Sequence, residues 1–330
     1  MNLATEYLGL TLKNPLMPGA SPLVDDLSTV RRLEDAGAAA IVMHSLFEEQ
    51  LELEHLALER DVESHNESFA EATTYLPNEA DFDETSEEYL ELIGKIKASV
   101  SIPVIASLNG TTPGGWTSHA KLIEQAGADA LELNYYDLPS DPIKTGAEIE
   151  ARALDLVAAI RKEVRIPVAV KLSPFFSSLP NFVSRLKTAG ANGVILFNRF
   201  YQPDINIEDL DTDSVLELST PAELRLRLRW LAVLSAQVDT SYAATGGVHS
   251  AEDAVRAIMA GAHAVQMVSA LLKNGPDYLA TVLAGLTQWL EEHEYESLAQ
   301  MRGTMNLKHC PDASAFERAN YLRLLKSWQA

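Results

Sequence analysis

Three successive apolar segments in the middle of the sequence each end in a polar residue. Asn134 follows Ala-Leu-Glu-Leu, Lys171 follows Val-Ala-Val, and Asn198 follows Val-Ile-Leu-Phe. Packing does not require amides and an ammonium at such places, so we expect all three heads to project into one site. Amides can hydrogen-bond a planar ligand, and a fixed ammonium can stabilise negative charge on a reduced isoalloxazine ring. The ordinary alternative for Lys171 is a surface or ion-paired lysine.

Two short turns near the end of the apolar repeats have the composition of a phosphate site. Gly246 and Gly247 follow one apolar run, and Val268 and Ser269 follow the next and open a helix-patterned segment. Glycines let backbone N–H groups approach an anion, and a nearby helix N-terminus adds favourable charge. A lone Gly-Gly pair also fits an ordinary turn, but two such turns after consecutive strands predict a bound phosphate group.

The elements that position these residues are predicted by a repeated Ala-Gly-Ala turn. Its copies, centred on Gly37, Gly127, Gly190 and Gly261, each lead from a helix-patterned segment into an apolar run. Alternating helices and apolar strands indicate a parallel sheet covered by helices, and eight such units indicate a closed (β/α)8 TIM barrel. The expected strands span 15–19, 39–43, 103–107, 130–134, 167–172, 193–198, 242–245 and 263–267.

Helices are expected over 26–36, 86–98, 114–126 and 147–164. Another should begin at Thr220, because Thr220, Pro221 and Glu223 match a capping box with proline in the first turn. Ser250 and Asp253 match a second capping box. We expect one barrel domain over 1–330, with excursions over about 46–84 and 199–220 and a helical tail over about 275–330 that packs below the barrel or forms a dimer contact.

Composition narrows the classes of protein that the chain can represent. The net charge of −21 disfavours nucleic acid and anionic membranes as partners, and no apolar run is long enough to span a bilayer. A cytoplasmic location is expected. The single cysteine, Cys310, excludes an internal disulfide and a cysteine-rich metal site, so no metal is expected.

The acidic residues are concentrated in one part of the sequence. Between Glu48 and Glu91 there are sixteen Asp or Glu residues and one basic residue, Arg60. The ordinary interpretation is a solvated insertion, and the functional one is a docking face for a basic redox partner protein.

With these features in place, the chain resembles the dihydroorotate dehydrogenase family, in its soluble class 1 branch. The resemblance spans about 14–274, and its order and spacing are specific. It is carried by Asn14-Pro15-Leu16, Gly19-Ala20-Ser21, Glu132-Leu133-Asn134, Val170-Lys171-Leu172-Ser173-Pro174, Asn198 and Thr245-Gly246-Gly247-Val248. It implies an oxidoreductase of pyrimidine biosynthesis, with noncovalent FMN on a (β/α)8 barrel. The FMN contacts that it implies are Ala20, Ser21, Ser45, Asn134, Lys171, Gly246, Gly247, Val268 and Ser269.

The resemblance breaks down on the substrate side. Where the family places a catalytic cysteine, this chain has Asp137, and Pro139 replaces a substrate-binding asparagine. His44 aligns with the family's lysine after strand two. Another substrate-binding asparagine of the family aligns near Ala72 of this chain.

Oxidation of dihydroorotate requires a base for one proton while flavin N5 takes a hydride. We predict Asp137 as the base, with Tyr136 or His44 as weaker substitutes, and Lys171 at the flavin. His44, Asn134 and Asn198 are the predicted substrate contacts. Asp137 could also be an ordinary loop acid, and the substrate could differ from dihydroorotate.

Two further functions stay open at this level. The chain could be the flavin-bearing subunit of a larger redox complex without dihydroorotate activity. It could also be a flavin-free phosphosugar lyase or isomerase that uses Lys171 as a Schiff-base nucleophile. No Gly-x-Gly-x-x-Gly motif opens a helix, so direct use of NAD has no support, and the electron acceptor stays open. A homodimer is implied by resemblance alone.

Overall fold

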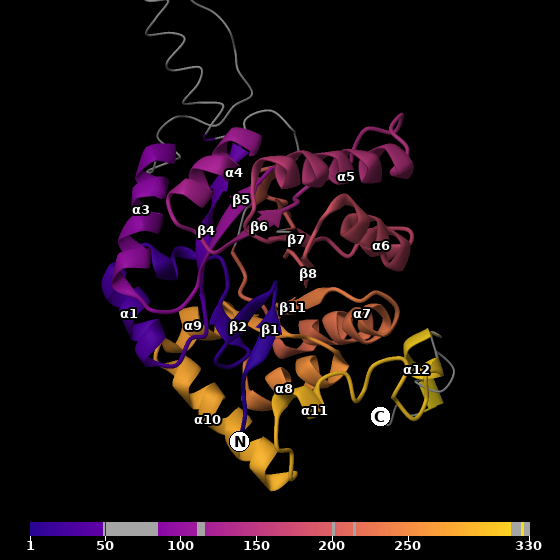
Figure 1. Cartoon of the computed structure of the whole chain (residues 1–330). Coiled ribbons are helices and arrows are strands. Elements are labelled where there is room, and N and C mark those ends of the chain that lie inside the picture. The colour runs from indigo at the N-terminus through magenta and orange to yellow at the C-terminus, as the bar shows by residue number, and fades with distance from the viewer. Residues whose placement is uncertain are drawn as a thin grey trace, which may run out of the picture.

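Eight parallel strands form the centre of the protein in the computed structural model of the chain (Figure 1). The structure describes residues 1–48, 50, 85–110, 116–199, 202–213, 216–317 and 325–326. Round the sheet the strands follow the order β3-β12-β11-β8-β7-β6-β5-β4. Their bounds are Leu16–Pro18 (β3), Ile41–Phe47 (β4), Val104–Asn109 (β5), Ala130–Asn134 (β6), Val168–Leu172 (β7), Gly193–Leu196 (β8), Ser241–Thr245 (β11) and Ala264–Met267 (β12).

The two end strands of this sheet also meet. The Ala39 N–H, just before β4, donates to the carbonyl oxygen of Leu16 in β3 at 2.8 Å. The sheet therefore closes into a barrel, and the predicted (β/α)8 fold is confirmed with each of its eight expected strands.

The helices pack outside the strands (Figure 1). Their bounds are Leu27–Asp35 (α1), Ser86–Ser99 (α3), Trp116–Gln125 (α4), Gly146–Glu163 (α5), Leu179–Ala189 (α6), Leu224–Gln237 (α7), Ala251–Ala260 (α8), Ser269–Asn274 (α9), Tyr278–Glu292 (α10), Leu298–Met301 (α11) and Ser314–Glu317 (α12). The expected helices are confirmed, and α6 is the helix-patterned segment that leads into the turn at Gly190. Both predicted capping boxes form, at Thr220 before α7 and at Ser250 before α8.

Alternate residues of the strands face two different cores. Leu131 and Leu133 of β6 belong to the large core between barrel and helices, whereas Ala130 faces the barrel interior. The interior layer is rich in small residues, which leaves room for side chains from below. Its small members are Ala39, Ala40, Ala130, Ala169, Ala243 and Ala264.

A β-hairpin of strands β1 (Thr5–Tyr7) and β2 (Leu10–Leu12) fills this room. Tyr7, Leu8 and Leu12 are buried in the same cluster as the interior alanines. A Cβ on Gly193 of β8 would lie 2.6 Å from Leu8 Cδ2, so the hairpin reaches the strand backbone itself. The hairpin therefore closes the barrel at the end opposite the carboxyl ends of the strands. The sequence motifs do not predict it.

The predicted excursions and tail are described in part. The first excursion lies mostly outside the described residues, which exclude 49 and 51–84. In the second, β9 (Asp204–Asn206) and β10 (Asp211–Asp213) pair as an antiparallel hairpin. The tail runs along the barrel helices, because Gly303 N–H donates to Ile258 O of α8 at 3.0 Å and Leu307 N–H to Ala232 O of α7 at 2.9 Å. Nowhere in the described ranges is a helix long and apolar enough to cross a lipid bilayer.

Candidate active site

A cavity of about 620 Å³ opens at the carboxyl ends of the barrel strands, where (β/α)8 enzymes hold their active sites. Most of the predicted site residues line it. The predicted residues in its lining are Ala20, Ser21, Asn134, Tyr136, Lys171, Asn198, Gly246, Gly247, Val268 and Ser269. Ser45, His44 and Asp137 are not in this lining. The size lies within the range of small-molecule sites.

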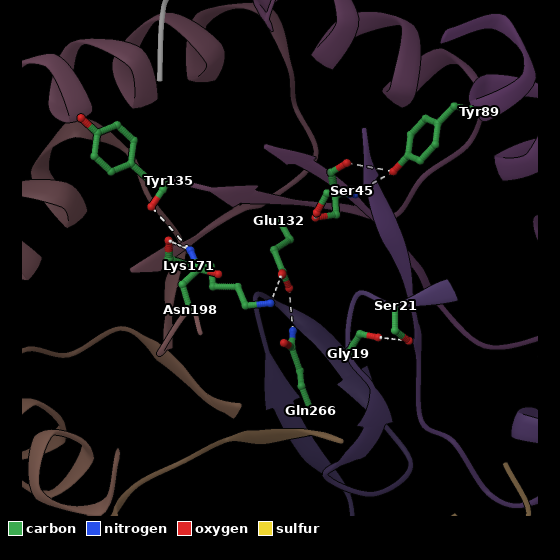
Figure 2. Close-up of polar contacts among 10 residues, drawn as sticks. Gly19, Ser21, Ser45, Tyr89, Glu132, Tyr135, Lys171, Asn198 and Gln266 are labelled. Carbon is green, nitrogen blue, oxygen red and sulfur yellow. Dashed lines mark hydrogen bonds and ion pairs between the residues drawn. The ribbon is translucent and has the colours of Figure 1, made fainter. Parts of the chain in front are cut away.

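The floor of the cavity holds an ion pair inside the barrel. Figure 2 shows the Lys171 ammonium and the Gln266 amide converging on the carboxylate of Glu132. Lys171 Nζ lies 3.1 Å from Glu132 Oε1, and Gln266 Nε2 donates to Glu132 Oε2 at 2.6 Å. Lys171 is therefore ion-paired as its ordinary interpretation proposed, but within the barrel rather than on the surface. Together with burial, the Glu132 carboxylate raises the pKa of the Tyr7 hydroxyl below it.

Glu132 and Gln266 are site residues that the sequence interpretation did not single out. Both are buried, and they come from β6 and β12, which lie four strands apart round the barrel. The available signal is the period of two along a strand: Glu132 precedes the predicted site residue Asn134 by two positions and so shares its face. A charged residue on the inward face of an apolar strand needs a buried partner.

Two buried acceptors among the cavity-lining residues have no partner within the described part of the chain. They are Oδ1 of Asn134 and Oε1 of Gln266. A buried amide oxygen without a hydrogen bond is costly, so both atoms suit a ligand that carries N–H or O–H donors. Asn198 is used differently: its Nδ2 lies 3.4 Å from Lys171 O and 3.5 Å from Tyr135 O, bracing two strand ends (Figure 2).

The Gly-Gly turn that the sequence predicts to bind phosphate follows β11. Gly246 and Gly247 both adopt the left-handed conformation, with φ of 82° and 81°. Gly247 N–H donates to the Ser219 hydroxyl oxygen at 3.1 Å, and that hydroxyl donates to Ser269 Oγ at 2.9 Å. The turns after β11 and β12 are thus joined at one end of the cavity through Ser219, a cavity-lining residue that the motifs do not identify.

Ser45 and His44 lie on β4, beside the cavity rather than in its lining. The Ser45 hydroxyl is 2.7 Å from that of Ser107 on β5. The Tyr89 hydroxyl of α3 lies within hydrogen-bond distance of both strands, 3.0 Å from His44 O and 2.9 Å from Ser107 O. His44 Nδ1 is 2.8 Å from Asp25 Oδ1.

Asp137 is held by neighbours in its own loop and in α5. Arg152 Nη2 donates to Asp137 Oδ2 at 2.7 Å, and the Tyr135 hydroxyl donates to the same oxygen at 3.1 Å. Burial and the Asp137 carboxylate raise the pKa of Tyr135. The structure therefore does not bring Asp137 together with Lys171 and Tyr136 in the cavity lining.

Comparison with known proteins gives a consistent result. The family model described as dihydroorotate dehydrogenase matches residues 67–290. A putative dihydroorotate dehydrogenase A (fumarate) of Aeropyrum pernix is 31% identical over 224 residues, which cover 66% of this chain and 72% of that protein. A dihydroorotate dehydrogenase B (NAD(+)) catalytic subunit of Methanothermobacter thermautotrophicus is 26% identical over 313 residues, 91% of this chain and 97% of the relative.

A third relative shows the same breadth of similarity. The dihydroorotate dehydrogenase B (NAD(+)) catalytic subunit of Methanocella arvoryzae is 29% identical over 299 residues, or 88% of this chain and 94% of that protein. The family model spans more than half of the chain, and the barrel and cavity described above agree with it. This chain belongs to the dihydroorotate dehydrogenase family.

Proposed function

We propose that the protein is an FMN-dependent oxidoreductase that oxidises a CH–CH bond of dihydroorotate or a related small cyclic substrate. The observation that carries this proposal is one cavity that joins a buried Lys171–Glu132 pair to the Gly246-Gly247 turn. The first end suits a polar ring and the second a phosphate. The same proposal places the protein in the cytoplasm as a homodimer.

The donor and acceptor set of the cavity fits FMN. The free acceptors Asn134 Oδ1 and Gln266 Oε1 and the donor Lys171 Nζ complement a ring that carries both N–H and carbonyl groups. Ala20, Ser21, Val268 and Ser269 line the same cavity, and Ser219 extends its polar end. Ser45 lies outside this lining and remains a proposed FMN contact on the family resemblance alone. When bound there, FMN would supply the acceptor for a hydride equivalent.

Lys171 has the clearest role among the proposed catalytic residues. Its ammonium is held in place by Glu132, so a positive charge faces the ring end of the cavity without reorganisation during the reaction. A Schiff-base lysine instead needs an apolar or cationic environment that favours its neutral form. The partner carboxylate therefore favours electrostatic work by Lys171 over covalent chemistry.

Tyr136 and Asp137 are the two candidates for the general base. Tyr136 lines the cavity, whereas Asp137 is occupied by Arg152 and Tyr135. A general base must reach the proton that it removes. Our proposal therefore assigns proton transfer to Tyr136 and makes Asp137 the residue that positions the loop carrying it. We also propose that His44 and Asn198 act on the substrate side. His44 lies outside the cavity lining, so it would act through neighbouring residues.

A second candidate function has support of its own. Several relatives are named as catalytic subunits of dihydroorotate dehydrogenase B (NAD(+)), a name that describes a part of a larger enzyme. By analogy, this chain could be the flavin-bearing subunit of a redox complex, with the acidic stretch around 48–91 as the surface for a basic partner. Asp137 is already bound by Arg152 and Tyr135, and this would be compatible with a loss of dihydroorotate activity.

The test is an anaerobic absorption spectrum of the purified protein, loaded with FMN and then mixed with dihydroorotate. We expect a flavin spectrum that bleaches on addition of the substrate. A flavin spectrum that stays oxidised would retain the cofactor and favour the second candidate. Failure to bind FMN at all would contradict both.

A further inference from the structure

A buried arginine lies directly behind the Gly246-Gly247 turn. Arg227 of α7 is 5% exposed, its Nε donates to Thr245 O at 2.9 Å, and its Nη1 donates to Glu223 O at 2.9 Å. A Cβ on Gly246 would lie 2.9 Å from Arg227 Nη2, so the guanidinium packs against the Gly246 backbone. The arginine is thus separated from the cavity by one residue of main chain.

The positive charge of Arg227 is only partly neutralised. Its nearest described carboxylate oxygen, Glu223 Oε2, is 4.0 Å away, and the same oxygen lies 3.4 Å from Nε of Arg199. Arg199 itself lines the cavity. Two guanidinium groups therefore share one carboxylate, and we call Arg199, Glu223 and Arg227 the charge triad.

The pKa of Arg227 reflects the same two neighbouring charges. Burial lowers its pKa; Glu223 opposes that shift, and the second cation, Arg199, adds to it. Glu48 and Glu217 are further carboxylates in the cavity lining. Glu217 is exposed to water, where its field is screened, and Glu48 follows β4, three strands from β11 round the barrel. Arg227 is buried, so its charge is screened much less. A net positive charge at one end of the cavity stands out in a chain whose net charge is −21.

We propose that the charge triad is the electrostatic half of a phosphate-monoester site, in which Arg227 acts through the Gly246 backbone on the phosphate of the bound cofactor. The backbone of the turn and the hydroxyls of Ser219 and Ser269 would supply the hydrogen bonds. A phosphate monoester carries a charge of about −1.5 to −2 at pH 7, so an adjacent net positive charge favours its binding. The inference rests on the proposed binding of FMN.

The experiment compares FMN with riboflavin, which has the same ring but no phosphate. Apoprotein is titrated with each flavin by fluorescence quenching, for wild type and for Arg227→Met. We expect the variant to bind FMN at least about tenfold more weakly, as the loss of a unit charge at short range in a partly buried site predicts. Riboflavin affinity should change by less than about threefold, because riboflavin carries no charge for Arg227 to act on.

Two variants control for structural effects. Arg225→Met removes the same charge from an exposed position on the same helix, and it should leave the affinities for both flavins unchanged. Glu223→Gln keeps the shape of the Thr220 capping box but raises the net charge of the triad, so it should tighten FMN binding and leave riboflavin binding alone. Glu223→Gln therefore tests the inference even where Arg227→Met is too unstable to purify.

The outcomes separate the inference from the proposed function. If wild type binds neither flavin, FMN binding itself is wrong. If wild type prefers FMN but the ratio of the two affinities is unchanged in Arg227→Met and Glu223→Gln, the triad has no role in phosphate binding and the inference is overturned. An equal loss of affinity for both flavins in Arg227→Met would assign Arg227 a purely structural role and also overturn it.

Discussion

At the scale of single residues, the site depends on one carboxylate that touches no solvent. Glu132 is fully buried, and it holds the Lys171 ammonium on one oxygen and the Gln266 amide on the other. Gln266 donates its N–H to Glu132, and its carbonyl oxygen has no hydrogen-bond partner among the described residues. One buried acid thus sets the orientation of a donor and an acceptor in the cavity.

We expect Glu132→Gln to lower the free energy of unfolding by about 3 kcal/mol, because it leaves the Lys171 ammonium buried without a counter-charge. Lys171→Met should also destabilise, and the double variant should lose at least about 1 kcal/mol less than the sum of the single losses. Urea denaturation of the apoprotein measures all three. Strictly additive losses would mean that the two charges are not coupled in solution.

The loop after β6 gives a prediction about catalysis. With a substrate that reduces the flavin, Tyr136→Phe should slow reduction by about 100-fold, the usual scale of a lost proton-transfer group. Asp137→Asn should slow it by less than about tenfold and mainly lower the melting temperature, because its ion pair with Arg152 is lost. Stopped-flow spectroscopy of flavin bleaching distinguishes them. The reverse order of effects would restore Asp137 as the base.

At the scale of elements, the turn after β11 depends on how closely α7 approaches it. A Cβ on Gly247 would lie 2.5 Å from the backbone nitrogen of Leu224, the first residue of α7. The capping box at Thr220 fixes where that helix begins and therefore where its first residue meets the turn. The start of α7 and the Gly246-Gly247 turn therefore form one structural unit.

This close approach predicts different effects at two glycines. Gly247→Ala should lower the free energy of unfolding by about 3 kcal/mol, from its positive φ together with the clash. Gly9→Ala is the matched control: its φ is also positive, at 80°, but nothing lies within 4 Å of the added Cβ, so a loss of about 1 kcal/mol is expected. Equal losses in urea denaturation would contradict the close packing.

At the scale of the whole molecule, stability should depend on the pH through a histidine near the hairpin that closes the barrel. Burial, helped by Arg302, lowers the pKa of His263 to about 4, while Asp239 acts in the opposite direction. Its Nδ1 accepts a hydrogen bond from Tyr242 N–H at 3.1 Å, which requires the unprotonated nitrogen. The folded protein therefore holds His263 neutral where the unfolded chain binds a proton.

The sign follows from this difference in proton binding. Between pH 6.5 and about 4 the unfolded chain takes up a proton that the folded protein does not, so the free energy of unfolding should fall by up to about 3 kcal/mol on acidification. In His263→Asn, whose amide oxygen can accept the same hydrogen bond, this part should vanish. Urea denaturation from pH 8 to pH 4 should show wild type losing up to about 3 kcal/mol more than the variant, and parallel curves would contradict the prediction.

The sequence by itself determined the order of the barrel and the place of its mouth. The Ala-Gly-Ala turns and the apolar runs are local, periodic signals, and strand ends in such a barrel gather at one edge, so Asn134, Lys171 and Gly246 could be placed together. The hairpin at residues 5–12 carries no comparable signal, because its burial depends on interior alanines from distant strands.

The tertiary structure alone decided which polar atoms meet. Glu132 and Gln266 are 134 positions apart, and only barrel closure brings them together. Asp137 occupies the sequence position where the family has a catalytic base, but the fold directs its carboxylate toward Arg152. Arg227 reaches the Gly246-Gly247 turn because α7 packs behind it. Such contacts depend on the direction of each side chain after packing, which no local pattern of residues encodes.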